Sequence, residues 1–206
     1  MDPTPAVWVC ETPDDDPRWA RTTLLAVAAR VAGGARGSLR LEHEGTGRPV
    51  VRGAGPDLRA SLSHGRAVVA VALSGAGDVG VDVERVRSLP AVRLARRWLS
   101  PAAADWVAAR APAQRDAAFL WLWTQKEAVG KARGTGLTAG LLRAPVTLPD
   151  RWPVGPGGLT PRPVPGDPAI AVAAGPAGPG VLVALAHVGP PVAAPVPVHQ
   201  LPFSEL

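Results

Sequence analysis

The sequence has little of several residue types, and each shortage narrows the class of protein. Cys10 is the only cysteine among 206 residues, tyrosine is absent and phenylalanine occurs twice. One cysteine cannot form an internal disulfide, so a disulfide-stapled secreted scaffold is not supported. The apolar runs at residues 67–73 and 181–188 fall well short of the ~20 residues that span a bilayer. We expect buried strands there, no membrane partner and, since no signal peptide precedes the first helix, a cytoplasmic location.

Lysine is also scarce. The chain has two lysines, Lys126 and Lys131, against twenty arginines, and its formal net charge is +5. A basic chain indicates an anionic partner, which is nucleic acid, a phosphorylated small molecule or an acidic protein. The compact ammonium of lysine suits a phosphate oxygen or a proton transfer better than the planar guanidinium does. The two lysines therefore indicate a site that binds phosphate or transfers a proton. The alternatives are that the lysines were retained by chance or that one forms an ordinary surface ion pair with Glu127.

The order of local patterns predicts a fold of the α/β (α+β) class. Polar residues at 61–65 indicate a turn, and Ser100 before Pro101 is a helix N-cap pattern. Helical patterns restart after the strand that ends near residue 86, so we expect an N-terminal half, 1–90, and a C-terminal half, 91–206. The expected elements are a helix at 17–32, strands at 38–44, 66–74 and 77–86, helices at 94–110 and from 116 onward, and strands joined by long turns after 144.

The stretch "VGVDVERV" predicts a strand with two acids on one face. Side chains alternate along a strand, so Asp82 and Glu84 point away from Val81 and Val83. The two carboxylates then stand about 7 Å apart, where a hard divalent cation relieves their repulsion. The alternative is a strand whose acidic face is simply solvated.

The stretch "RDAAFLWLWTQKEAVGKARG" predicts a helix with a mixed stripe. Steps of three and four residues align Leu120, Trp123, Glu127 and Lys131. The stripe is apolar at one end and charged at the other, which places Glu127 and Lys131 at the margin of the core. Partial burial there can shift the pKa of a side chain. Gly130 costs the helix about 1 kcal/mol relative to alanine, which suggests that a partner or ligand group approaches there.

Together, "GVDVE" and "WTQKEAVGKARGTGL" resemble the signature motif pair of the 4′-phosphopantetheinyl transferase superfamily, in its single-chain, surfactin synthetase-activating type. The stretches "GRP" at 47–49 and "SLSH" at 61–64 fall in the order expected for that family, and "VPVHQLPFSEL" resembles its closing strand. The resemblance covers residues 18 to 206. It implies a pseudo-dimer of two similar α/β halves, each a small, mostly antiparallel sheet packed on helices, with the active site and coenzyme A in the cleft between them.

The resemblance also implies roles for individual residues. Lys131 matches the motif lysine expected on the coenzyme A pyrophosphate, and Lys126 matches the other motif lysine, which is also expected to bind coenzyme A. The segment before the first helix is shorter than expected, and Gly65 replaces the serine that often follows the histidine. The other matches are Asp82, Glu84 and Glu127 as magnesium or manganese ligands, Ser63 and His64 as contacts to coenzyme A phosphates, Arg48 at the nucleotide end, and Arg21 with Thr22 or Thr23 at the 3′-phosphate.

The implied reaction is the transfer of 4′-phosphopantetheine from coenzyme A to a serine of an acyl or peptidyl carrier protein, with release of 3′,5′-ADP. Asp82, Glu127 and Lys131 would be catalytic, and Glu127 or a metal-bound water would accept the serine proton. Carrier proteins are acidic, so Arg93, Arg96 and Arg97 are expected to form a docking surface. Because one chain holds both halves of the cleft, we expect a monomer.

Two alternatives from other classes are open. A basic nucleic-acid-binding protein agrees with the charge, but the lack of tyrosine and of a recognisable binding motif argues against it, so no nucleic-acid partner is expected. The other alternative is a catalytically degraded homologue that serves as a synthase scaffold or regulator. The presence of Asp82, Glu84, Glu127 and Lys131 argues against such decay.

Overall fold

Two β-sheets form the centre of the molecule. The computed structural model describes residues 4–45, 47–53, 58–149, 152, 155, 158–189, 192 and 194–206. The first sheet has the strand order β10-β1-β5-β4-β3-β2. Its strands are antiparallel except for the parallel pair β1 and β10. They comprise β1 (Ala6–Glu11), β2 (Arg40–His43), β3 (Pro49–Arg52), β4 (Leu58–His64), β5 (Val68–Ser74) and β10 (Val198–Gln200).

The second sheet is fully antiparallel and has the order β6-β9-β8-β7. Its strands are β6 (Asp78–Arg85), β7 (Arg162–Val164), β8 (Asp167–Gly178) and β9 (Val181–Val188). The expected fold class, mixed α and β with mostly antiparallel sheets packed on helices, is confirmed.

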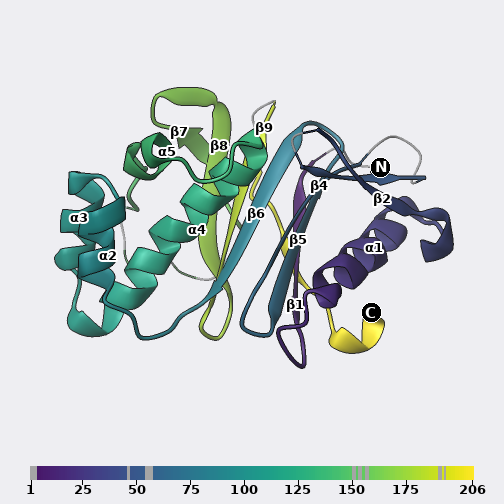
Figure 1. Cartoon of the computed structure of the whole chain (residues 1–206), viewed down its shortest axis with the longest axis horizontal. Coiled ribbons are helices and arrows are strands. Elements are labelled where there is room, and N and C mark those ends of the chain that lie inside the picture. Colours follow the sequence, from purple (N-terminus) through teal and green to yellow (C-terminus); the bar gives the residue numbers. More distant parts are fainter. Residues whose placement is uncertain are drawn as a thin grey trace.

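The helices cover the outer faces of the two sheets. Figure 1 shows α1 beside the first sheet and α4 across the second, with α2 and α3 beyond α4. No helix of the described residues has both the length and the apolar character needed to cross a bilayer. The helices are α1 (Arg18–Ala32), α2 (Ala91–Trp98), α3 (Pro101–Ala108), α4 (Arg115–Arg133) and α5 (Ala139–Arg143).

The layering explains the two long apolar runs. Strand β5 lies between α1 and the second sheet, so Val69 and Val71 pack in the α1 core while Val68 and Ala70 pack between the sheets. Strand β9 is buried on both faces in the same way, between the first sheet and α4. A strand covered on both faces needs apolar residues at successive positions rather than at alternate ones.

Strand membership crosses the middle of the sequence. Strand β6 lies before residue 90 in the sequence but belongs to the second sheet. Strand β10 lies after residue 90 but pairs with β1 in the first sheet. Each half of the chain thus contributes a strand to the sheet of the other half. The division into halves 1–90 and 91–206 remains a prediction.

Most expected elements are present at the expected positions. The helix expected at 17–32 is α1, and the strand at 77–86 is β6. The hydroxyl of Ser100 caps α3 by accepting from the N–H of Ala103 at 3.3 Å. The glycine-rich stretch at 45–56 indicates a loop around a short extended piece. The extended piece is β3, and part of the loop lies outside the described residues.

The turn expected at 61–65 is wrong over its first four residues. Residues 61–64 continue strand β4, and the turn occupies residues 65–67. Serine and histidine are frequent in turns, which favoured the incorrect assignment. In the folded chain the hydroxyls of Ser61 and Ser63 bond to groups of β6. This long-range pairing outweighs their local preference.

Candidate active site

The site is built where the edge strand β6 meets β4 of the other sheet. Strand β6 pairs with β9 on one side, so on its other side the backbone groups need different partners. The N–H of Val81 donates to the Oγ of Ser61 at 3.0 Å, and the carbonyl of Val81 accepts from the Nζ of Lys131 at 3.0 Å. The junction between the two sheets is therefore polar at this point.

Asp82 occupies the centre of this junction. Only 6% of its surface is exposed. One of its oxygens, Oδ1, accepts from the Nζ of Lys131 at 2.8 Å and from the Oγ of Ser63 at 2.7 Å. A buried carboxylate is tolerated because both a charged and a neutral donor bond to it. Three separate elements, β6, α4 and β4, thus converge on one carboxylate.

Two glycines allow the close contacts that bring α4 to this carboxylate. A Cβ on Gly80 would lie 2.0 Å from the carbonyl oxygen of Ala128, so only glycine lets α4 pack this closely on β6. A Cβ on Gly130 would lie 2.7 Å from the carbonyl oxygen of Gly136. The group that approaches Gly130 is therefore the loop of the chain itself, held by a bond from the N–H of Thr135 to the Gly130 carbonyl at 3.1 Å.

Glu127 stands beside Asp82 and Lys131 at the margin of the core, as the helical stripe predicts. Its side chain is half-buried, and no hydrogen bond or ion pair to it exists among the described residues. Burial raises the pKa of Glu127, and the charges of Asp82 and Glu84 raise it further, while Lys131 lowers it. The charges of Asp82 and Glu84 therefore act on Glu127.

Two of these carboxylates have cationic partners. Lys131 binds Asp82, and Arg87 binds Glu84 at 2.5 Å. Across the described ranges, no three His, Cys, Asp or Glu side chains lie close enough together to hold a metal ion. The magnesium site therefore remains a prediction.

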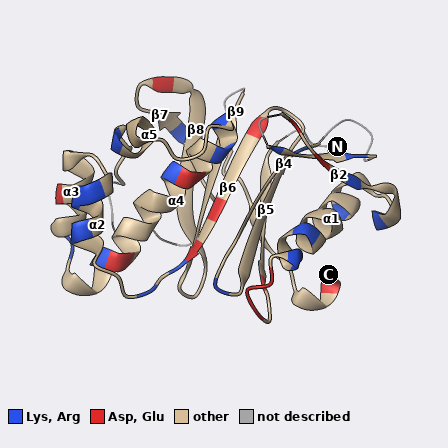
Figure 2. Cartoon of the chain, in the orientation of Figure 1, with Lys and Arg blue, Asp and Glu red and all other residues tan. Residues whose placement is uncertain are grey.

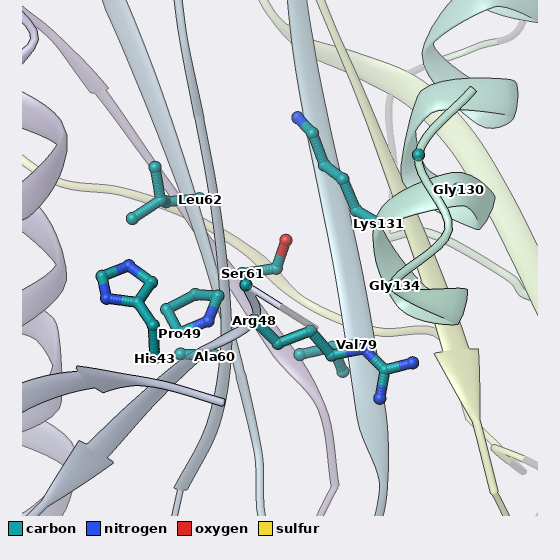
Figure 3. Close-up of a pocket in the computed structure, with 12 residues that line it drawn as sticks. His43, Arg48, Pro49, Ala60, Ser61, Leu62, Val79, Gly130, Lys131 and Gly134 are labelled. Atoms are coloured by element: carbon teal, nitrogen blue, oxygen red, sulfur yellow. The ribbon is translucent and has the colours of Figure 1, made fainter. Parts of the chain in front are cut away.

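A pocket of about 310 Å³ opens beside Lys131. Figure 3 shows Lys131 lying along β6 on one side, with Ser61 and Leu62 of β4 opposite it. The guanidinium of Arg48 points toward Gly134, at the end of α4. The two halves of the sequence each supply residues to this pocket.

Arg48 is held in the pocket by an ion pair with Asp78. Its Nε atom is buried and has no hydrogen-bond partner among the described residues. A buried N–H of a cation without a partner leaves a donor available to an anion. Together, Arg48 and Lys131 provide two cations that line one pocket.

Other predicted residues are placed away from this pocket. His64 is exposed at the end of β4. Arg21 is exposed on α1, and the hydroxyl of Thr22 donates to the carbonyl of Arg18 in the same helix. None of the three lines the pocket beside Lys131. Their proposed contacts to coenzyme A remain predictions.

The structure also separates the two lysines. Lys126 is 4% exposed, its Nζ donates to the carbonyl of Ala144 at 2.5 Å, and it lines a different pocket, beneath α5. Burial, and to a lesser degree the charge of Arg133, lowers the pKa of Lys126 to about 8. Lys126 and Lys131 thus line different pockets, and the contact of Lys126 to coenzyme A remains a prediction.

Three contributors to the site were missed by sequence reasoning. Ser61 and Asp78 act through partners far away in the chain, so no local pattern identifies them. Gly80 carried a signal, because a glycine inside a β-branched strand suggests close backbone approach. The motif containing it was noted, but its packing role was not.

Part of the chain is similar to known proteins. Residues 78–157 match the model of the 4′-phosphopantetheinyl transferase superfamily, so the resemblance seen in the motifs is confirmed. The chain is 34% identical over 100 residues to the 4′-phosphopantetheinyl transferase psf-1 of Bacillus pumilus, covering 48% of this chain and 42% of that protein. It is 40% identical over 82 residues to the transferase AcpT of Salmonella typhimurium, covering 39% and 43%.

A third relative extends the match. The transferase HetI of Nostoc is 28% identical over 120 residues, covering 57% of this chain and 51% of that protein. The matched segments thus span about half the length of these relatives. The superfamily segment, residues 78–157, contains Asp82, Glu84, Glu127 and Lys131.

Proposed function

We propose that this chain, whose residues 78–157 match the 4′-phosphopantetheinyl transferase superfamily, transfers 4′-phosphopantetheine from coenzyme A to a serine hydroxyl of an acyl or peptidyl carrier protein. The observation that carries the proposal is the junction itself. Lys131 is held 2.8 Å from the buried Asp82, beside the half-buried Glu127, at the edge of a pocket that contains a second cation, Arg48.

Lys131 and Arg48 would bind the phosphates of coenzyme A. Both line the same pocket, and Arg48 has an unused buried donor. Cations fixed by ion pairs do not reorganise when charge develops on a phosphoryl group, so they stabilise the transition state more than mobile ones do. Lys131 in particular is held between Val81 and Asp82.

The chemistry of three carboxylates, rather than their spacing in this structure, supports a magnesium site. Asp82, Glu84 and Glu127 offer the hard oxygen ligands that magnesium prefers, although no three such side chains of the described residues lie close enough together to hold an ion. Magnesium, or manganese, would be held by Asp82, Glu84 and Glu127 and would neutralise charge on the pyrophosphate of coenzyme A.

The proton of the carrier serine would pass to Glu127. The serine oxygen forms a bond to the phosphorus that carries pantetheine, and the bond from that phosphorus to the oxygen of the departing 3′,5′-ADP breaks. Glu127 suits the role of base, because no ion pair holds it among the described residues and burial raises its pKa above the ordinary value for a glutamate.

The basic helix α2 would receive the carrier protein. Arg93, Arg96 and Arg97 lie on α2, and Trp98 at its end is 40% exposed, with Arg97 stacked 5.1 Å over its ring. Figure 2 shows basic residues along this helix. An exposed aromatic ring beside arginines suits an acidic partner with an apolar contact at its centre.

We also propose a cytoplasmic monomer that depends on no second copy. Both β4 and α4, which come from different halves of the sequence, supply the pocket within one chain. Carrier modification whose specific rate rises with enzyme concentration would contradict this part of the proposal.

The test is intact mass spectrometry of carrier proteins incubated with the enzyme, coenzyme A and magnesium. The expected result is the mass of one phosphopantetheine added to the carrier. A carrier whose acceptor serine is replaced by alanine, and a reaction containing excess chelator, should both stay unmodified. An unmodified panel of carriers in the presence of folded enzyme would overturn the proposal, and salt-sensitive binding to random oligonucleotides would then favour a nucleic-acid-binding protein.

A further inference from the structure

A second pocket lies on the opposite side of α4 from the carboxylates. Its cavity measures about 190 Å³, and it is enclosed by α4, α5, the segment after α5 and the hairpin of β7 and β8. This is less than the ~300–1,000 Å³ of sites for drug-sized ligands, so an occupant must be small. The lining is largely apolar and includes Val129, Leu141, Val146, Val164 and Val172.

Lys126 places an ammonium group in this apolar lining. The residue is 4% exposed, and its Nζ makes one hydrogen bond, to the carbonyl of Ala144. An ammonium has three donors, so one bond to a neutral acceptor leaves its bonding capacity incomplete. Among the described residues, no carboxylate forms an ion pair with Lys126.

The charges around the pocket leave a net positive field. Asp167, a carboxylate of the lining, is paired with Arg133 at 2.7 Å, and Arg133 also lines the pocket. The pair is neutral as a unit, so the charge of Lys126 is not balanced by it. A buried cation without a counter-ion is costly, and an anion that enters the pocket offsets part of this cost.

We propose that the pocket beneath α5 is a second ligand site, which takes a small carboxylate with a short apolar chain. The carboxylate would pair with Lys126, and the chain would contact the valine and leucine side chains of the lining. A single negative charge matches a single ammonium, whereas a phosphate dianion would bring an unpaired charge into an apolar cavity. The site is independent of the pocket beside Lys131.

A purely structural role for Lys126 is the competing explanation. Ala144 is the C-cap residue that follows α5, and a lysine near a helix C-terminus bonds favourably to the last carbonyls. Such a role would make Lys126 important for stability but would give the pocket no affinity for an acid. Binding measurements therefore distinguish the two explanations, whereas stability alone does not.

The test is calorimetric titration of the full chain with hexanoate, 1-hexanol and acetate. Hexanoate should bind and raise the melting temperature. Hexanol, which lacks the charge, and acetate, which lacks the chain, should each bind at least tenfold more weakly. No binding of hexanoate at millimolar concentration, or equal binding of hexanol, would overturn the proposal.

Two variants locate the binding. Lys126→Met keeps an unbranched side chain without the charge and should lose at least tenfold in hexanoate affinity, whereas the matched variant Lys131→Met should retain it. If Lys126→Met does not fold, Val146→Phe fills the pocket from a half-buried position and should also abolish hexanoate binding. Unchanged affinity in the folded Lys126→Met or Val146→Phe protein, or equal loss in Lys131→Met, would contradict the assignment.

Discussion

The two lysines of α4 lie in opposite kinds of surroundings although five positions separate them. Lys131 is partly exposed and bound to a carboxylate, Asp82, at the junction of the sheets. Lys126 is buried in an apolar pocket without an acidic partner among the described residues. The comparison shows that the role of each lysine depends on the residues that pack against its face of the helix. One face of α4 meets the acidic strand β6, and another meets apolar residues of β7, β8 and α5.

The largest expected effect comes from removing the acid on the Lys131 face. Asp82→Ala should lower carrier modification on the order of a thousandfold or more, because the variant loses a proposed metal ligand and releases Lys131. Asp82→Asn keeps the shape and the bond from Ser63, yet should be nearly as inactive. Rates follow from intact mass spectrometry over time, with circular dichroism as the folding control. Near-normal modification by Asp82→Asn would remove Asp82 from the catalytic group.

Exchanging lysine for arginine on each face is the next test. Lys131→Arg keeps the charge but brings a wider planar group between Val81 and Asp82, so kcat should fall about ten- to a thousandfold with a smaller change in KM. Lys126→Arg, the matched variant on the other face, should change kcat less. Steady-state kinetics with coenzyme A and a carrier measure both. Equal losses in the two variants would mean that the faces do not differ in function.

A substitution at Gly80 tests whether close packing of α4 on β6 creates the difference between the faces. An alanine Cβ there would meet the Ala128 carbonyl at 2.0 Å, so Gly80→Ala should lower the free energy of unfolding by about 1–3 kcal/mol or more. Gly140→Ala in α5, where the nearest atom is 4.0 Å away, should instead be neutral or slightly stabilising. Urea unfolding compares the two. A stable Gly80→Ala protein would contradict the packing argument.

The smallest expected effect concerns a buried histidine whose ring nitrogens have no hydrogen-bond partner among the described residues. His187 on β9 is 2% exposed, and neither ring nitrogen has a partner among the described residues. Burial lowers the pKa of His187 below its ordinary value of 6.5, partly opposed by the charge of Asp78. The unfolded chain therefore takes up this proton at a higher pH than the folded chain. The stability contribution is full above pH 6.5 and is lost as the pH falls through the folded-state value.

His187→Leu should remove this pH dependence. The free energy of unfolding, measured in urea between pH 5 and 8, should fall more steeply below pH 6.5 in the parent than in the variant. Parallel curves for the two proteins would show that His187 does not titrate differently in the folded and unfolded chains.

The parts of the site that depend on local periodicity were predictable. Alternation along β6 separates Asp82 from Val81, and helical spacing places Glu127 and Lys131 together at the core margin. The same helical geometry puts Lys126 about 100° away from Glu127. In agreement with this geometry, Lys126 and Lys131 line different pockets in the structure.

The parts that depend on long-range pairing were not predictable. Ser61 and Ser63 are typical turn residues by type, but in the fold they bond to groups of β6. Gly130 suggested a ligand, but the group that lies against it is the carbonyl of Gly136 in the chain's own loop. Sequence patterns specify the face on which a side chain lies. They do not specify which distant element that face meets.

Hydrogen exchange with and without coenzyme A and magnesium tests the central claim most directly, which is that the Lys131 face of α4 binds the substrate. We expect slower exchange in β6, at the end of α4 and in residues 134–137, with little change in β7 and β8. Protection confined to α5, β7 and β8 would place coenzyme A on the Lys126 face and contradict the account.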